Sequence, residues 1–406
     1  MTDLALLGGT PAKRKPFPPW PQYDAREAEA LQQVLESRIW WRTPGTQTLR
    51  FEQAFASAHG AAHGIAVTNG THALEVAIAA LGIGYGDEVI VPDSTFIATA
   101  SAVLTAGALP VLVDVDMTTF NVDIARVEAA ITPRTRCIIA VHMGGLPVDM
   151  DALLLLAARH GIPVLEDSSH AHGSEWRGRR VGALGIAGTF SFQSSKTMTA
   201  GEGGIIITQD ADFERRARSI TDCGRLPGHW FYEHFDNASN YRLSEWQGAV
   251  LNVQLERLEA QTALRHRNAR LLDEVMSEIH GITPQAIDER CTRNGHYLYM
   301  FHYDPPAFGG LPTARFIEAL HAEGIPSQAT YPPLSALAVF RDGAYQKKIP
   351  PGMPNDALRH APFIHSARIL REVVCLPHAT LLGDEDDIHE IGAAVRKIQQ
   401  HARALL

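Results

Sequence analysis

Short apolar runs alternate with helix-like segments along the first two-thirds of the chain. The apolar runs occupy residues 88–92, 110–115, 137–142, 163–167, 189–193 and 204–208. Such an alternation is typical of βαβ units, whose parallel strands are buried on both faces of the sheet. The pattern therefore predicts an α/β domain built on a largely parallel sheet.

The last third of the chain carries a different pattern. A long helical segment begins near Ser244, with leucines at 251, 255 and 258 on one helical face. A strand-like segment at 296–304 and a helix-like segment at 313–324 follow. A final helix begins near Asp384, because its acidic first turn suits a helix N-terminus. We expect the long helical segment to act as a connector.

Length and charge limit the function classes. The chain has 406 residues, more than one hydrophobic core usually serves. We therefore expect a large domain at residues 1–260 and a smaller α/β domain at residues 261–406. The formal net charge of -9 argues against a nucleic-acid-binding protein, since phosphates are neutralised by clustered Lys and Arg. The short basic run at 13–15 is expected to lie in a solvated N-terminal arm.

The N-terminus, the apolar runs and the cysteine spacing bear on the cellular location of the protein. The N-terminus lacks the basic start and long apolar stretch of a secretory signal, and no apolar run approaches the ~18 residues of a membrane span. These features predict a cytoplasmic protein without membrane association. The four cysteines lie far apart and form no CxxC pair, which favours reduced thiols over disulfides or a zinc site.

Lys196 lies between the apolar runs at 189–193 and 204–208. A lysine is normally solvated, because its pKa of about 10.4 keeps it charged and makes burial costly. Both neighbouring runs have the character of interior strands. The pattern therefore predicts a lysine in a loop between two interior strands, where desolvation would lower its pKa.

The turn Asn69-Gly70-Thr71 opens an almost wholly apolar helix-like segment. The first N–H groups of a helix have no intrahelical partner and the helix dipole is positive there, so a phosphate can bind. The alternative interpretation is structural, with Asn69 and Thr71 only capping a core helix. The sequence leaves both interpretations open.

Asp167 lies at the carboxyl end of the run at 163–167, the end where ligands bind in open α/β sheets. Its carboxylate can pair with a buried cationic nitrogen, or it can cap the next turn. His170 and His172 follow at a spacing seen in some metal sites. No carboxylate or cysteine completes a recognisable ligand pattern around them, so no metal is expected.

Other common chemistries lack their motifs. The glycines at 82–88 follow a helix-like segment and precede a strand, the reverse of a dinucleotide fingerprint. The P-loop pattern and the GxSxG motif are absent. An anion cradle, an interior aspartate and an interior lysine remain. Pyridoxal 5'-phosphate (PLP) requires these three groups, for its phosphate, its protonated pyridine nitrogen and its aldehyde.

Several segments resemble the DegT/StrS aminotransferases, PLP enzymes of the aspartate aminotransferase fold (fold type I). The segment SFQSSKTMTAGEGG resembles the lysine motif of that family, and GDEVIVPDSTFIATA resembles its ring-stacking strand and turn. NYRLSEWQGAVL resembles the segment that the family lends to a neighbouring subunit. The likeness runs from about residue 18 to the C-terminus. It implies an α/β fold with a mostly parallel sheet in the large domain and a smaller α/β C-terminal domain.

The resemblance also implies roles at matching positions. Lys196 would be the catalytic lysine that binds the aldehyde of PLP and moves protons. Further cofactor contacts are implied for Asn69, Gly70, Thr71, Phe96, Asp167, His170, Ser191, Gln193 and Asn240. Of these, Asp167 would meet the pyridine nitrogen, Phe96 would stack on the ring, and His170 would lie near the 3-hydroxyl side. Asn69 stands where the family often has serine, so the set of phosphate donors stays open.

Different segments of the chain resemble two different groups within this family. The segments at 20–24, 40–42, 68–75 and 141–153 resemble 3-amino-5-hydroxybenzoate synthases, which aromatise an aminoshikimate-type ring. The segments at 296–316 and 329–334 resemble aminocyclitol aminotransferases, which use glutamine and a keto-cyclitol. Ser194-Ser195 before the lysine departs from the Asn-Gly typical of both groups, which leaves a third specificity open.

The resemblance favours a PLP-dependent aminotransferase that moves an amino group from glutamine or glutamate to a keto sugar or keto-cyclitol in an antibiotic-type pathway. The alternatives are a 3-amino-5-hydroxybenzoate synthase and a PLP-binding regulator without turnover.

We expect the acceptor side of the active site to be lined by aromatic and basic residues, namely Trp40, Trp41, Arg42, His142, Tyr297 and Tyr331. A core role for the two tryptophans and a surface role for the arginine is at least as good an interpretation. The family resemblance further implies a homodimer in which Asn240 reaches the neighbouring subunit's site.

Overall fold

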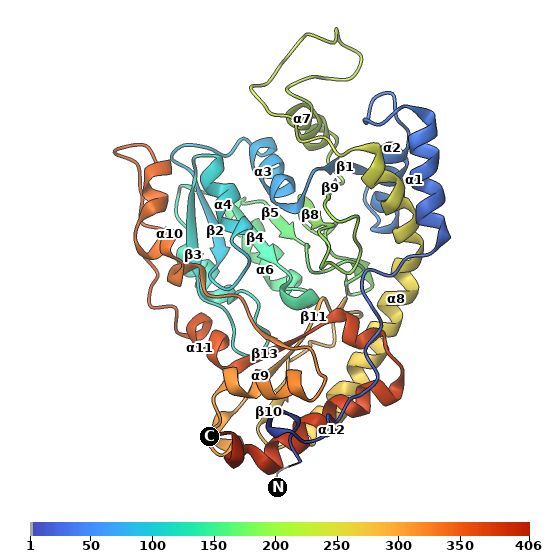
Figure 1. Cartoon of the computed structure of the whole chain (residues 1–406). Coiled ribbons are helices and arrows are strands. Elements are labelled where there is room, and N and C mark those ends of the chain that lie inside the picture. Colours follow the sequence, from blue (N-terminus) through green and yellow to red (C-terminus); the bar gives the residue numbers. More distant parts are fainter. Residues whose placement is uncertain (1–2) are drawn as a thin grey trace.

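The computed structural model describes residues 3–406, and its largest element is a seven-stranded sheet in the order β1-β9-β8-β5-β4-β2-β3 (Figure 1). The strands are β1 (His63–Val67), β2 (Glu88–Pro92), β3 (Leu109–Val113), β4 (Thr135–Val141), β5 (Val164–Asp167), β8 (Ala187–Ser191) and β9 (Gly204–Thr208). The pairs from β8 to β3 are parallel, whereas β9 is antiparallel to both β8 and β1. The predicted α/β fold with a mostly parallel sheet is confirmed.

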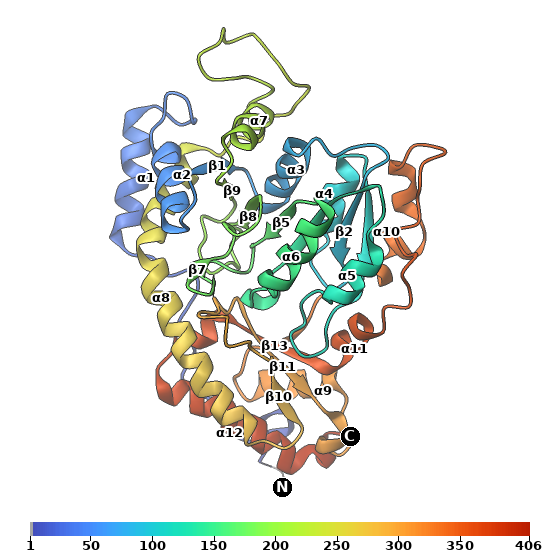
Figure 2. The same ribbon diagram turned by 180° about the vertical axis from the view of Figure 1, so that it is seen from behind.

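Helices cover this sheet, and most of them begin at a capping side chain. They are α3 (Gly70–Ala80), α4 (Ala98–Thr105), α5 (Ile124–Ala130), α6 (Met150–His160) and α7 (Ala211–Thr221). Asn69, Asp123, Asp149 and Asp210 accept backbone hydrogen bonds at the starts of α3, α5, α6 and α7. Figure 2 shows α5 and α6 over one face of the sheet. The strands between the helices are almost fully buried, as their apolar sequences require.

The C-terminal part has its own antiparallel sheet in the order β10-β11-β13-β12. Its strands are β10 (Ile282–Pro284), β11 (Leu298–Tyr303), β12 (Gln328–Ala329) and β13 (Val373–Pro377), and a separate hairpin joins β6 (Glu175–Trp176) to β7 (Arg179–Arg180). The helices are α8 (Glu245–Ser277), α9 (Thr313–Ala322), α10 (Ala338–Arg341), α11 (Ile364–Glu372) and α12 (Glu385–His401). Helix α8 runs along both sheets (Figure 1), as the predicted connector does. The domain boundary at residue 260 stays a prediction.

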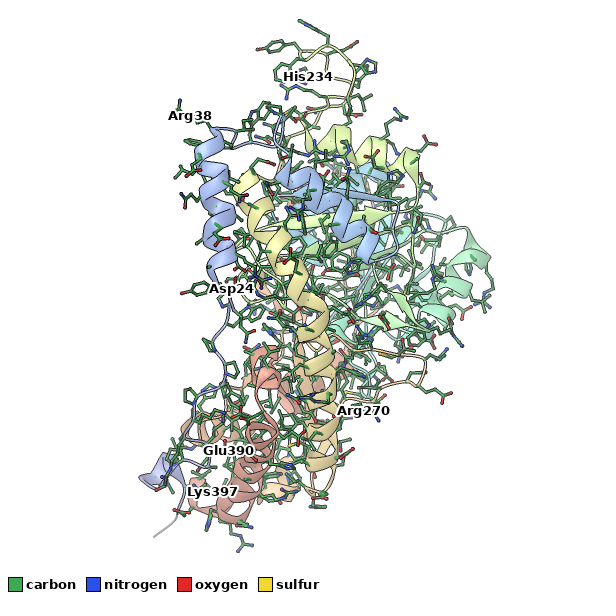
Figure 3. All side chains as sticks on the ribbon, turned by 90° about the vertical axis from the view of Figure 1, so that its right-hand side faces the viewer. Asp24, Arg38, His234, Arg270, Glu390 and Lys397 are labelled. Carbon is green, nitrogen blue, oxygen red and sulfur yellow. The ribbon has the colours of Figure 1, made fainter. Side chains whose placement is uncertain are left out.

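The N-terminal segment contradicts one expectation from the sequence. It runs beside α8 and α12 before reaching α1 (Ala25–Ser37) and α2 (Gln47–Ala58) (Figure 3). Lys13 is not solvated but buried, and its Nζ lies 2.5 Å from Asp387 Oδ1 and 2.9 Å from Glu390 Oε2. The predicted solvated arm is therefore wrong at Lys13, because two carboxylates on α12 compensate its charge. Lys15 is exposed, as expected.

Two further properties of the described chain bear on function. Between residues 3 and 406, no helix combines the length and apolar character needed to cross a membrane. The same residues contain no cluster of three or more His, Cys, Asp or Glu side chains arranged to hold a metal ion. Cys137, Cys223, Cys291 and Cys375 are unpaired.

Candidate active site

A cavity of about 600 Å³ lies at the carboxyl ends of β4, β5 and β8. It brings together most of the residues that the sequence singled out: Asn69, Gly70, Thr71, Phe96, Asp167, His170, Ser191, Gln193, Lys196, Tyr297 and Tyr331. Residues that the sequence did not single out also line it, among them His72, Thr95, Ser169, Ser195 and Glu202. Cavities at this edge of an α/β sheet are where ligands bind.

Lys196 lies in the loop between β8 and β9, as predicted. A tight turn positions it, since its backbone N–H donates to Gln193 O at 2.9 Å. Only 9% of the residue is exposed, and burial lowers the pKa of the Lys196 ammonium to about 8, against the opposing effect of Asp167. Its Nζ lies 4.4 Å from the centroid of the Tyr297 ring. About a tenth of this amine is therefore uncharged, and nucleophilic, at pH 7, far more than for a solvated lysine.

Asp167 ends β5 and is buried at the cavity wall. The Thr99 hydroxyl donates to its Oδ2 at 2.9 Å, and the Ser169 N–H donates to its Oδ1 at 3.3 Å. Thr99 was missed from the sequence, although it lies three residues after Phe96 in a segment already singled out. The carboxylate is thus held in one orientation, with its charge available to a cationic group in the cavity.

The first turn of α3, where the sequence predicts an anion cradle, lines the cavity. Asn69 Oδ1 accepts from the His72 N–H at 2.8 Å, so Asn69 is a helix cap. The capping interpretation and the anion interpretation are compatible, because the N–H groups of Gly70 and Thr71 precede the first intrahelical bonds. A Cβ at Gly70 would lie 2.7 Å from Ser191 Cβ, so only glycine lets α3 approach β8 this closely.

Aromatic rings form another part of the cavity lining. The rings of His170 and Tyr297 stack with centroids 4.2 Å apart, and the Tyr331 hydroxyl lies 3.3 Å from His170 Nε2. Burial, followed by the charge of Lys196, holds the pKa of His170 well below its usual range. His170 is therefore a neutral imidazole. The Phe96 ring is half exposed and lies 5.9 Å from the Tyr331 ring.

Several predicted site residues lie outside the cavity of this chain. His142 is fully buried; its Nε2 lies 3.1 Å from Glu166 Oε2 and its Nδ1 accepts from the Val148 N–H. It therefore has no free ring nitrogen for an acceptor. Trp41 and Arg42 line a second cavity of about 300 Å³, where Arg42 Nη2 lies 2.9 Å from Glu52 Oε2.

Asn240 is exposed, and its Oδ1 accepts from the Arg242 N–H at 3.3 Å. It does not line the large cavity of its own chain. The segment between α7 and α8 that carries it projects from the body of the molecule, with His234 near its tip (Figure 3). Within one chain, this part of the predicted phosphate site is not assembled.

The residues present fit the PLP that the resemblance implies. Lys196 offers an amine of lowered pKa, Asp167 a fixed carboxylate and α3 a free helix N-terminus. Within the described chain, the buried His170 Nδ1 has no hydrogen-bond partner, and it adjoins the same cavity. Such a group can satisfy its hydrogen bonding with a ligand. The donor set thus matches an aldehyde, a pyridine nitrogen and a phosphate.

Comparison with known proteins supports this assignment. The family model of the DegT/DnrJ/EryC1/StrS aminotransferases matches residues 21–396. The chain is 42% identical to the 3-amino-5-hydroxybenzoate synthase of Amycolatopsis mediterranei, over 93% of this chain and 96% of that protein. It is 40% identical to the L-glutamine:2-deoxy-scyllo-inosose aminotransferase of Streptoalloteichus tenebrarius, over 98% of both. A crystal structure of 3-amino-5-hydroxybenzoic acid synthase superposes with a TM-score of 0.85 at 40% identity, covering 96% of this chain and 100% of that one.

Proposed function

Because this chain belongs to the DegT/DnrJ/EryC1/StrS aminotransferase family, whose members depend on PLP, we propose that it transfers an amino group from glutamine or glutamate to a keto sugar or keto-cyclitol. The observation that carries the proposal is the buried Lys196 amine, which faces the same cavity as Asp167 and the first turn of α3. The likeness to L-glutamine:2-deoxy-scyllo-inosose aminotransferases, which are 38% to 40% identical, supports the class of acceptor.

In this proposal, each group has a distinct task. When bound, PLP supplies an electron sink that weakens the bonds at the Cα of the amino donor. Asp167 holds the positive charge of a pyridine nitrogen, and Thr99 keeps that carboxylate oriented. The N–H groups of Gly70 and Thr71, with Ser191, bind the phosphate. The Nζ of Lys196 takes up and returns a proton, which its lowered pKa permits near neutral pH.

The rest of the cavity suits a hydroxylated ring. Imidazole, phenol, amide and hydroxyl groups line it, from His170, Tyr297, Tyr331, Gln193 and Ser195. Such groups both donate and accept hydrogen bonds, as the hydroxyls of a sugar or cyclitol require. The flat faces of the aromatic rings can pack against the carbocycle.

A second candidate is a 3-amino-5-hydroxybenzoate synthase. The observation that favours it is the 42% identity to the enzyme of that name from Amycolatopsis mediterranei, together with the superposition reported above. This activity would use the same lysine to remove protons and water from an aminoshikimate-type ring. The two functions share the cofactor site, so they must be separated by their substrates.

The deciding experiment supplies each substrate in turn to the PLP-loaded enzyme. One reaction contains glutamine and 2-deoxy-scyllo-inosose, and the other contains 5-amino-5-deoxy-3-dehydroshikimate, with Lys196→Ala as the control for both. Amine transfer to the ketone supports the aminotransferase, whereas an aromatic product selects the synthase. Turnover of neither substrate, nor of other keto sugars, would favour a PLP-binding regulator.

We further propose a cytoplasmic homodimer with shared active sites. No arginine lines the large cavity within the described chain, although the carboxylate of an amino donor needs a cation other than Lys196. The segment that carries Asn240 also exposes Trp230, Phe231, Tyr232 and Phe235, apolar surface that a monomer rarely leaves uncovered. Both observations support a partner subunit that completes the site. Unpaired cysteines support the reducing cytoplasm.

A further inference from the structure

The Ser194-Ser195 pair directly precedes the reactive lysine, where related enzymes are expected to have Asn-Gly. The backbone of this pair is anchored from two sides. The Trp20 Nε1–H donates to Ser194 O at 3.0 Å, and His378 Nε2 lies 3.1 Å from Ser195 O. Because these contacts involve only main-chain oxygens, a change of the Ser195 side chain leaves them in place.

The Ser195 hydroxyl links two side chains of the cavity. It lies 2.7 Å from Gln193 Oε1 and 3.0 Å from the Tyr297 hydroxyl. The amide oxygen can only accept, so the single Ser195 proton is directed to Gln193. The Tyr297 hydroxyl then donates to Ser195 Oγ. A glycine at position 195 would remove this connection altogether.

The Tyr297 ring contacts both Lys196 and His170. The Lys196 amine lies over its ring at 4.4 Å from the centroid, and the His170 ring stacks on it at 4.2 Å with 24° between the planes. A ring in this position stabilises the ammonium form of the lysine through cation–π attraction. The rotation and height of the Tyr297 ring therefore affect both groups.

We propose that Ser195 is a positioning residue, whose hydroxyl holds the Tyr297 ring against Lys196 and His170. The importance of Ser195 for catalysis rests on the proposed function. The contact between the Ser195 and Tyr297 hydroxyls does not depend on that function. Without the hydroxyl, the Tyr297 phenol loses its acceptor and the ring can move away from the amine.

Other titratable groups also lie near Lys196. A test of the proposal must leave their contacts with Lys196 unchanged. Asp167 favours the ammonium form, while His170, His172 and His378 lie near enough for its charge to lower their pKa values. The Ser195 hydroxyl has no hydrogen bond to any of these four groups among the described residues. Its removal therefore acts on Lys196 through Tyr297.

The test measures the amine of Lys196 directly in the full-length apoprotein, without PLP. Acetylation of Lys196 by acetic anhydride is followed by peptide mass spectrometry as a function of pH, which gives the pKa of the amine. Ser195→Ala and Tyr297→Phe should each lower this pKa by about 0.5, and the double variant should lower it no further, since both changes break one contact. Ser195→Thr, which keeps the hydroxyl, should match the wild type.

Ser194→Ala is the matched control, because Ser194 Oγ contacts the Gln193 amide but not Tyr297. It should leave the pKa of Lys196 unchanged. Equal pKa values in wild type and Ser195→Ala, or additive shifts in the double variant, would overturn the proposal. Because the readout needs neither cofactor nor substrate, it is independent of the proposed function, whose failure would show separately as an absence of amine transfer by the PLP-loaded wild-type enzyme.

Discussion

The hydroxyl of Thr99, on α4, donates a 2.9 Å hydrogen bond to Oδ2 of Asp167, at the end of β5. This contact joins the segment after β2, which carries the Phe96 ring, to the carboxylate that faces the cavity. A hydrogen bond to a charged group contributes about 1.5–3 kcal/mol, more than an ordinary one. The orientation of Asp167 should therefore depend on Thr99.

Thr99→Val should weaken PLP binding by about tenfold, because Asp167 loses the donor that fixes its carboxylate. The dissociation constant of PLP, measured by quenching of protein fluorescence, gives the result. Thr99→Ser keeps the hydroxyl and should retain near-normal affinity. If the valine variant binds PLP as tightly as the wild type, Thr99 does not support the cofactor site.

Lys196 should bind PLP covalently in a pH-dependent manner. Only the uncharged amine attacks an aldehyde, and burial lowers its pKa from 10.5 to about 8. The rate of attachment should therefore rise with pH and reach half of its plateau near pH 8 rather than above pH 10. Borohydride trapping followed by peptide mass spectrometry measures this rate. Lys196→Ala should give no adduct while the chain keeps its circular dichroism spectrum, and an adduct on another lysine would disprove the assignment.

Asp93 ties together the two segments that carry the Phe96 and Tyr331 rings. Its Oδ1 accepts from the Ser335 N–H at 2.7 Å and its Oδ2 from the Ser335 hydroxyl at 2.9 Å. Burial raises the pKa of Asp93 from 3.8 to about 6, although these hydrogen bonds oppose the shift. The folded protein therefore binds a proton between these pH values that the unfolded chain releases.

A raised folded-state pKa stabilises the protein at low pH and loses this effect as pH rises through the folded value. The contribution of Asp93 to the free energy of unfolding should fall by about 1 to 3 kcal/mol between about pH 4 and pH 6. Asp93→Asn should lack this component, so the difference in free energy of unfolding between variant and wild type should change across that range. Urea unfolding at several pH values measures it, and a difference independent of pH would contradict the prediction.

The fold was predictable where burial makes the pattern simple. The runs at 88–92 and 204–208 coincide with β2 and β9, because strands buried on both faces are continuously apolar. Strand β1 was missed, since its histidine, glycine and alanine give no such run. The antiparallel direction of β9 also has no local signal, because strand direction depends on the connection rather than on composition.

The sequence allowed the positions of the site residues along the chain to be predicted. It did not show in which direction their side chains point. Asp167 ends a buried strand and Lys196 follows one, and both residues line the cavity. His142 also follows a buried strand, yet its ring turns to Glu166. Thr99 and Ser195 contribute through hydrogen bonds to partners that are 68 and 102 residues away in sequence, which no local pattern reveals.

The buried N-terminal lysine offers a test of stability. Lys13 compensates Asp387, which is itself buried on α12, whereas Lys15 contacts Asp384 at the surface. Lys13→Met should leave the buried Asp387 carboxylate with only the Lys15 ammonium, 3.7 Å from its Oδ2, and lower the free energy of unfolding by about 3 kcal/mol or more. Lys15→Met removes an exposed ion pair with Asp384, which water screens, and should lower the free energy of unfolding much less. Equal losses in urea unfolding would show that burial of Lys13 does not matter.

The last prediction concerns the shared active site. Asn240 lies on a projecting segment outside the cavity of its own chain, while Lys196 lies inside it. If Asn240 serves the phosphate site of the neighbouring subunit, Asn240→Asp should inactivate that site by repelling the phosphate. Lys196→Ala should inactivate the subunit that carries it.

Mixing the two inactive variants after dissociation and reassembly distinguishes the arrangements. In a mixed dimer with crossed sites, one site carries both defects and the other carries neither, so up to about a quarter of wild-type activity should return at equal amounts, because half of the dimers are mixed and each has one intact site. If Asn240 acts within its own subunit, every site keeps one defect and the mixture stays inactive. Reassembly of wild-type chains by the same procedure controls for losses. An inactive mixture alongside active reassembled wild type would rule out the crossed site.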